Sequence, residues 1–165
     1  MEISTEKAEL EKASRDTSLF QVMPSEIAWP KNAQELAELV RNTKTSITAR
    51  AGGTDMTGGP LNTGTIVEFT KYMNKVIEVG ENYAVTEPGV YYRDFEKATL
   101  AKGLILPSYP ASREICAMGG IVANNSGGER TLEYGKTEKY VEELEVVLAD
   151  GSITTFKNLS PSELQ

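Results

Sequence analysis

The sequence predicts an α+β fold, because a β-α-β segment comes first and short strands joined by tight turns follow. Residues 27–50 contain a short apolar strand, an amphipathic helix and a second strand, an order typical of parallel pairing. Later runs rich in β-branched and aromatic residues are separated by turn residues. With 165 residues, the chain can form one domain or two small subdomains that share a cleft.

The N-terminal half predicts two helices around a short extended segment. Residues 5–14 are rich in Glu, Lys, Ala and Leu, which favour a helix. Residues 27–30 are expected to be extended because they end in a proline. A second helix begins after Asn32, which can cap it, with Glu35 placed as in a capping box. Residues 46–50 form the next strand, which we expect to run parallel to residues 27–30.

The second half predicts further strands and one more helix. The helix covers residues 92–102 and ends at Gly103. Residues 107–139 show no clear periodicity, so we expect a long irregular segment with a functional role. Asp150-Gly151 is a strong hairpin signal. Strands are expected over residues 65–69, 75–79, 83–86, 141–149 and 152–156.

Composition excludes several classes of function. The net charge is −7 and there is no long basic run, so a nucleic-acid-binding surface is not expected. The sequence has no histidine and one cysteine, Cys116, so we expect no metal site of the usual zinc or iron kind. Serine–histidine and cysteine–histidine nucleophile pairs are excluded for the same reason. No catalytic residue is predicted, and chemistry must come from a cofactor or from a part of the protein outside this chain.

The ends of the chain and its hydropathy bear on location and completeness. No apolar stretch approaches the roughly 20 residues that span a bilayer, and residues 1–7 lack a signal-peptide pattern. We therefore expect a cytoplasmic protein without a transmembrane segment. Residues 160–163 have the form of a helix start, yet the sequence ends two residues later. This pattern predicts that the chain is an N-terminal fragment of a longer protein.

Two glycine-rich segments, residues 50–59 and 119–128, are the candidate binding elements. Neither is a Walker A motif or a Gly-x-Gly-x-x-Gly turn. Clustered backbone N–H groups in such segments form concavities for anions, and two of them could hold a diphosphate without a lysine. The alternative is a pair of glycine-rich surface loops with no ligand.

A series of short motifs follows in order along residues 16–151. They include Ala-Gly-Gly-Thr-Asp at 51–55, Glu-Pro-Gly-Val at 87–90 and Cys-Ala-Met-Gly-Gly-Ile-Val-Ala-Asn-Asn-Ser-Gly-Gly at 116–128. The remaining motifs lie at residues 16–18, 27–30, 73–76, 134–135 and 141–151. Together they resemble the FAD-binding domain of the vanillyl-alcohol oxidase family, also called the PCMH-type FAD-binding fold.

Within that family, residues 107–151 are most similar to the D-lactate dehydrogenase and glycolate oxidase branch. This resemblance implies an FAD-dependent oxidoreductase that acts on the CH–OH group of a 2-hydroxy acid by hydride transfer to FAD. It also implies a small-molecule substrate bound by a C-terminal domain missing here, so the chain alone should be inactive. Residues 51–55 also resemble the FAD electron-transfer subunit of molybdenum hydroxylases. A non-catalytic nucleotide-binding module is a further alternative.

The resemblance implies a fold of two subdomains with FAD extended between them. Residues 1–19 would form an N-terminal helix and a lead-in segment, and residues 20–80 a small β-α-β subdomain. Residues 81–165 would form a larger antiparallel sheet with helices, truncated at the C-terminus. The implied cofactor-binding residues are Ala51, Gly52, Gly53, Thr54, Asp55 and Met56 at the diphosphate, Glu87 and Pro88 beside the cofactor, and Ser112, Met118, Gly119, Gly120, Asn124 and Gly127 on the flavin and ribityl side.

The mode of FAD attachment and the roles of three further residues can also be predicted. Many family members attach FAD through a histidine, so its absence predicts non-covalent FAD. Cys116 could form a thioether, but we expect a buried small hydrophobe there. Asp55 is expected to stabilise a turn rather than act as a base. Arg50 could contact a phosphate or form a surface ion pair.

Overall fold

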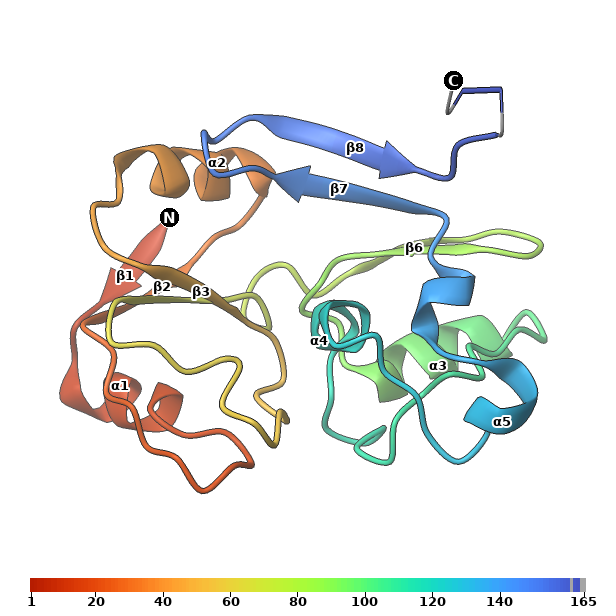
Figure 1. The fold of residues 1–165 in the computed structure, drawn as a ribbon, viewed down its shortest axis with the longest axis horizontal. Helices are drawn as coiled ribbons and strands as arrows, with labels where there is room; N and C mark the ends of the chain where they lie inside the picture. Colours follow the sequence, from red (N-terminus) through yellow and green to blue (C-terminus); the bar gives the residue numbers. More distant parts are fainter. Residues whose placement is uncertain (161, 164–165) are drawn as a thin grey trace.

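The computed structural model describes residues 1–160 and 162–163, which contain both helices and strands, as predicted (Figure 1). The N-terminal part is built on a four-stranded sheet in the order β1-β2-β4-β3. These strands are β1 (Glu2–Ser4), β2 (Glu26–Trp29), β4 (Thr65–Glu68) and β3 (Ile47–Arg50). The predicted α+β class is therefore confirmed.

Strand order in this sheet differs from the simplest expectation. β2 and β3 do run parallel, but each pairs with β4, which lies between them. The prediction of a direct β2–β3 pair was therefore wrong. β1 joins the outer edge of β2 in antiparallel orientation and was not predicted. Three residues are too few to carry a periodic signal, so only pairing with β2 defines this strand.

Each face of the sheet is covered by one helix, because side chains alternate along a strand. Ile27 and Ile66 face α1 (Lys7–Ala13), whereas Ala28 and Val67 pack with α2 (Ala33–Asn42). The predicted cap of α2 is confirmed, since Asn32 Oδ1 accepts the N–H of Glu35 at 2.9 Å. The carboxylate of Glu35 accepts the N–H of Lys31 rather than that of Asn32, so the capping box is incomplete.

The C-terminal part has its own core. A β5–β6 hairpin, helix α3 and the segment after it enclose a buried cluster. β5 spans Val76–Val79, β6 spans Ala84–Thr86 and α3 spans Tyr92–Leu100. The cluster consists of Val90, Tyr92, Phe95, Tyr109, Cys116, Met118 and Ile121. This part therefore buries apolar surface independently of the first sheet.

Residues 107–139 are less irregular than expected. They contain α4 (Met118–Ala123), α5 (Thr131–Tyr134) and the start of a 3-10 helix, η1 (Thr137–Tyr140). The rest of the segment is irregular, as predicted, but the three helices were missed, because helices of four to six residues complete too few turns to show a period.

The last hairpin crosses over the N-terminal part. β7 (Glu143–Val147) and β8 (Ile153–Lys157) are joined by the predicted Asp150-Gly151 turn, with Gly151 at φ +76°. The carbonyl of Gly151 accepts a 2.8 Å hydrogen bond from Nη1 of Arg41 on α2. Figure 1 shows the β7–β8 turn beside this helix. The helix predicted from residue 160 includes Pro161, Leu164 and Gln165, which lie outside the described residues. Within the described part of the chain, no helix is long and apolar enough to cross a membrane.

Candidate cofactor site

The first glycine loop leaves β3 at the edge of the sheet. None of the backbone N–H groups of residues 51–56 donates to another described residue. Residues 51–55 are nonetheless half-buried, and only Met56 is exposed. Backbone N–H groups that are shielded from water are normally paired, so this run of donors without a protein partner suits an anionic ligand or bound water.

The guanidinium of Arg50 lies against Gly53 of this loop. Gly53 has φ +66°, and a Cβ added there would collide with the guanidinium of Arg50. Nη2 of Arg50 donates to the carbonyl of Arg15 at 2.8 Å, and burial lowers the pKa of the guanidinium. No carboxylate among the described residues forms a salt bridge with it. The surface ion pair, one of the two alternatives for Arg50, is therefore wrong. Arg50 instead connects the start of the loop to the carbonyls of residues 13 and 15.

Asp55 closes the turn within the loop. Its Oδ1 accepts hydrogen bonds from the N–H of Thr57 and, at 2.6 Å, from Thr57 Oγ1. These bonds favour the carboxylate and hold the pKa of Asp55 below its usual 3.8, the hydroxyl contribution being the larger. Asp55 therefore stabilises the turn, as expected for an aspartate that bonds the backbone two residues ahead.

This turn should make stability depend on pH. Because the folded pKa of Asp55 is lowered, its stabilising effect is present above 3.8 and disappears as pH falls below that value. We expect wild type to lose stability relative to Asp55→Asn between about pH 5 and about pH 2, since asparagine keeps the acceptor but does not titrate. Urea unfolding of both proteins across this range measures the difference. A constant difference would contradict the assignment.

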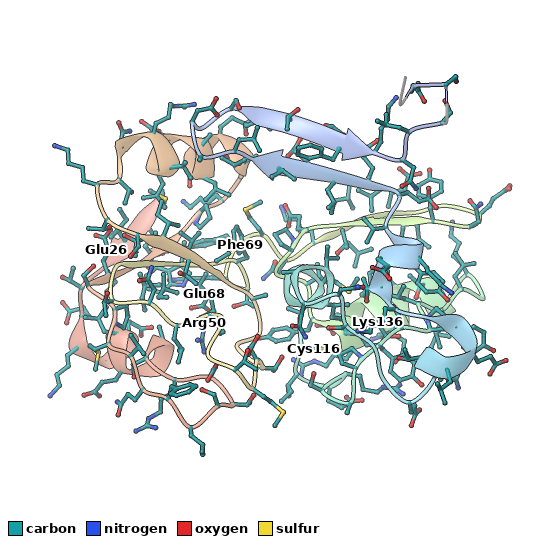
Figure 2. All side chains as sticks on the ribbon, viewed as in Figure 1. Glu26, Arg50, Glu68, Phe69, Cys116 and Lys136 are labelled. Carbon is teal, nitrogen blue, oxygen red and sulfur yellow. The ribbon has the colours of Figure 1, made fainter. Side chains whose placement is uncertain are left out.

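The second glycine segment lies against the first. A Cβ on Gly52 would lie 2.6 Å from the carbonyl oxygen of Ile115 and 3.2 Å from Cα of Cys116. A Cβ on Gly120 would lie 3.6 Å from that of Ala51. Figure 2 marks Arg50 and Cys116 in the two parts of the protein that meet here. The two predicted loops are therefore brought together across the boundary between the parts.

The Glu-Pro-Gly turn at residues 87–89 also contacts the second glycine segment. Gly119 donates its N–H to the carbonyl of Pro88 at 2.7 Å, and Gly89 donates to the carbonyl of Met73 at 2.8 Å. The carboxylate of Glu87 accepts the N–H of Lys75 at 2.7 Å. Glu87 thus closes the base of the β5–β6 hairpin, and Pro88 contacts the second loop directly.

The other predicted positions have different surroundings. The Met118 side chain is buried in the core, so only its backbone faces the junction. The carbonyl of Ser112 accepts the N–H of Cys116 at 2.9 Å. Asn124 is exposed at the end of α4, and Gly127 is half-buried. Among the described residues, no hydrogen bond joins Asn124 or Gly127 to residues 51–56.

Cys116 belongs to the core rather than to an open surface. It is 3% exposed, and burial raises the pKa of its thiol. It packs with Val90 and Tyr92 in the C-terminal cluster. This environment agrees with the expected small buried hydrophobe.

Sequence reasoning missed one residue at the loop. Thr17 donates from its hydroxyl and its N–H to carbonyls of residues 54 and 55. It belongs to the 16–18 motif, but a threonine in a short polar segment carries no local sign of such a contact. Only the fold brings these residues together.

The parallel sheet edge, the half-buried N–H groups and the close glycine contacts are typical of a domain that binds an anionic cofactor. A family model described as "FAD binding domain" matches residues 24–157. The chain therefore belongs to this family of FAD-binding domains.

Named relatives are consistent with this family. The glycolate oxidase subunit GlcD of Bacillus subtilis is 38% identical over 143 residues, covering 83% of this chain and 30% of that protein. The D-lactate dehydrogenase of Archaeoglobus fulgidus is 33% identical over 141 residues, covering 79% of this chain and 32% of that protein. The chain thus spans about a third of the length of these relatives.

A solved structure shows the same fold. The glucooligosaccharide oxidase of Acremonium strictum matches with a TM-score of 0.81 and 23% identity. The match covers 94% of this chain and 34% of that one. The PCMH-type FAD-binding fold is therefore confirmed.

Proposed function

We propose that this chain is the FAD-binding part of an oxidoreductase that oxidises a 2-hydroxy acid of the D-lactate or glycolate type. Family membership and the names of the two relatives support this assignment. The substrate and its binding residues would belong to a further domain, since the relatives are about three times longer. FAD, when bound, supplies the acceptor for hydride.

The observation that carries the proposal is the run of six backbone N–H groups at residues 51–56 without a protein acceptor, five of which belong to half-buried residues. These donors fit a diphosphate, because several N–H dipoles stabilise negative charge without a lysine. Gly120, which lies beside Ala51, and its neighbours Gly119 and Pro88, which contact each other, would line the flavin side. FAD would lie between a small subdomain, predicted at residues 20–80, and a larger one, predicted at 81–165, with β5 packed on the larger one.

We further propose that FAD is held without a covalent bond. The Acremonium strictum oxidase carries an FAD that is linked through a cysteine and a histidine. This sequence has no histidine, and its one cysteine is buried in the core. Acid precipitation of the FAD-loaded protein should leave the flavin in the supernatant. Flavin retained in the pellet would contradict this point.

A flavin fluorescence titration of the 165-residue protein tests FAD binding directly. We expect saturable binding of one FAD per chain and weaker binding of riboflavin, which lacks the diphosphate. We also expect no oxidation of D-lactate or glycolate by the loaded chain, because the proposed substrate-binding residues lie outside it. Absence of saturable FAD binding by a folded sample would overturn the proposal.

A further inference from the structure

Thr17 is hydrogen-bonded to the first glycine loop at residues 54 and 55. Its Oγ1 lies 2.9 Å from the carbonyl oxygen of Thr54 and 2.7 Å from that of Asp55. Its backbone N–H donates to the same Asp55 carbonyl at 3.1 Å. Thr17 itself is exposed, so these contacts are polar anchors rather than core packing.

Because the peptide bond is planar, these hydrogen bonds also fix the direction of two backbone N–H groups. In a trans peptide the carbonyl and the N–H of one planar unit point in opposite directions, and the described chain has no cis peptide. The Thr54 carbonyl shares its peptide unit with the N–H of Asp55, and the Asp55 carbonyl shares one with the N–H of Met56. Holding both carbonyls on the side of Thr17 therefore aims both N–H groups away from it.

Neither of these two N–H groups has an acceptor among the described residues. The two carbonyl oxygens would repel a diphosphate if they rotated toward it. Thr17 thus favours the one orientation of these peptides in which donors, not acceptors, face an anion.

The segment that carries Thr17 is fixed independently of the loop tip. Asp16 Oδ1 accepts the N–H of Ser18 at 2.8 Å, which closes a turn around Thr17. The N–H of Val22 donates to the carbonyl of Ser14 at 2.9 Å. Thr17 is therefore a defined anchor and not part of the loop that it holds.

We propose that Thr17 is a positioning residue for the cofactor diphosphate, acting through the peptide units that join residues 54, 55 and 56. This assignment rests on the proposed FAD function. Thr17 is not expected to touch the cofactor, since its single hydroxyl hydrogen is already shared between the two carbonyl oxygens.

The test compares wild type with Thr17→Val, which keeps the side-chain shape but loses the hydroxyl, and with Thr17→Ser, which keeps the hydroxyl. Titrations use FAD, ADP as a diphosphate without flavin, and riboflavin as a flavin without phosphate. Thr17→Val should weaken FAD and ADP binding about tenfold and leave riboflavin unchanged, while Thr17→Ser stays within about twofold of wild type. Backbone order parameters at residues 54–56 should fall only in Thr17→Val.

Each outcome bears on a distinct claim. Wild type that does not bind FAD overturns the proposed function and this assignment with it. Wild type that binds FAD, with Thr17→Val equally tight, overturns the positioning role alone. Equal weakening of all three ligands, or failure of Thr17→Ser to restore binding, also overturns that role, because a general loss of structure would then explain the effect.

Discussion

Replacing Gly52 with valine is expected to weaken FAD binding strongly. The new Cβ would lie 2.6 Å from the carbonyl oxygen of Ile115, 3.1 Å from the N of Ala117 and 3.2 Å from Cα of Cys116. These are backbone atoms, which cannot rotate aside as a side chain can, so the two glycine segments must separate. We expect affinity for FAD to fall by about a hundredfold or more, since overpacking of this kind costs up to about 3 kcal/mol. Flavin fluorescence titration measures the loss.

Gly120→Ala, on the opposite segment, is the control for the effect of an added side chain on folding. Its Cβ would meet only the Cβ of Ala51, at an ordinary contact distance of 3.6 Å, and alanine favours helix α4 over glycine. We expect its free energy of unfolding to stay within about 1 kcal/mol of wild type. If Gly52→Val binds FAD as tightly as wild type, the two segments do not need to touch in the bound protein.

Replacing Gly89 with alanine is expected to have the largest effect on stability. The added Cβ would overlap the carbonyl of Phe69 and lie 2.6 Å from the carbonyl oxygen of Met73. The turn at residues 87–90 links these N-terminal residues to Met118 and Gly119 at the start of α4. Displacing it disturbs both sides, and we expect the free energy of unfolding to fall by about 3 kcal/mol. Urea denaturation measures this change.

Gly80→Ala is the control for this effect. Its Cβ would meet the ring of Tyr83, a half-exposed side chain that can rotate into solvent. We expect a loss of stability below about 1 kcal/mol. Similar losses for Gly80→Ala and Gly89→Ala would show that the turn at residues 87–90 does not stabilise the contact between the two parts of the protein.

Local signals in the sequence predicted many of the individual elements. The cap at Asn32 and the Asp150-Gly151 hairpin were correct because each depends on residues only a few positions apart. β1 and the order β2-β4-β3 were not predictable in this way. Strand pairing is decided by contacts between distant segments, and a short strand has the same local pattern whichever neighbour it joins.

In the candidate site, too, some features follow from the local sequence and others only from tertiary contacts. The sequence alone determined the candidate segments, since the glycines at residues 51–59 and 119–128 predicted an anionic ligand bound by backbone N–H groups. Only the tertiary structure decided how they act together. The contact between Gly52 and Ile115 and the bond from Thr17 to Thr54, 37 positions away, join residues with no local relation. Such contacts arise from packing of the whole chain, and no periodicity or spacing along the sequence encodes them.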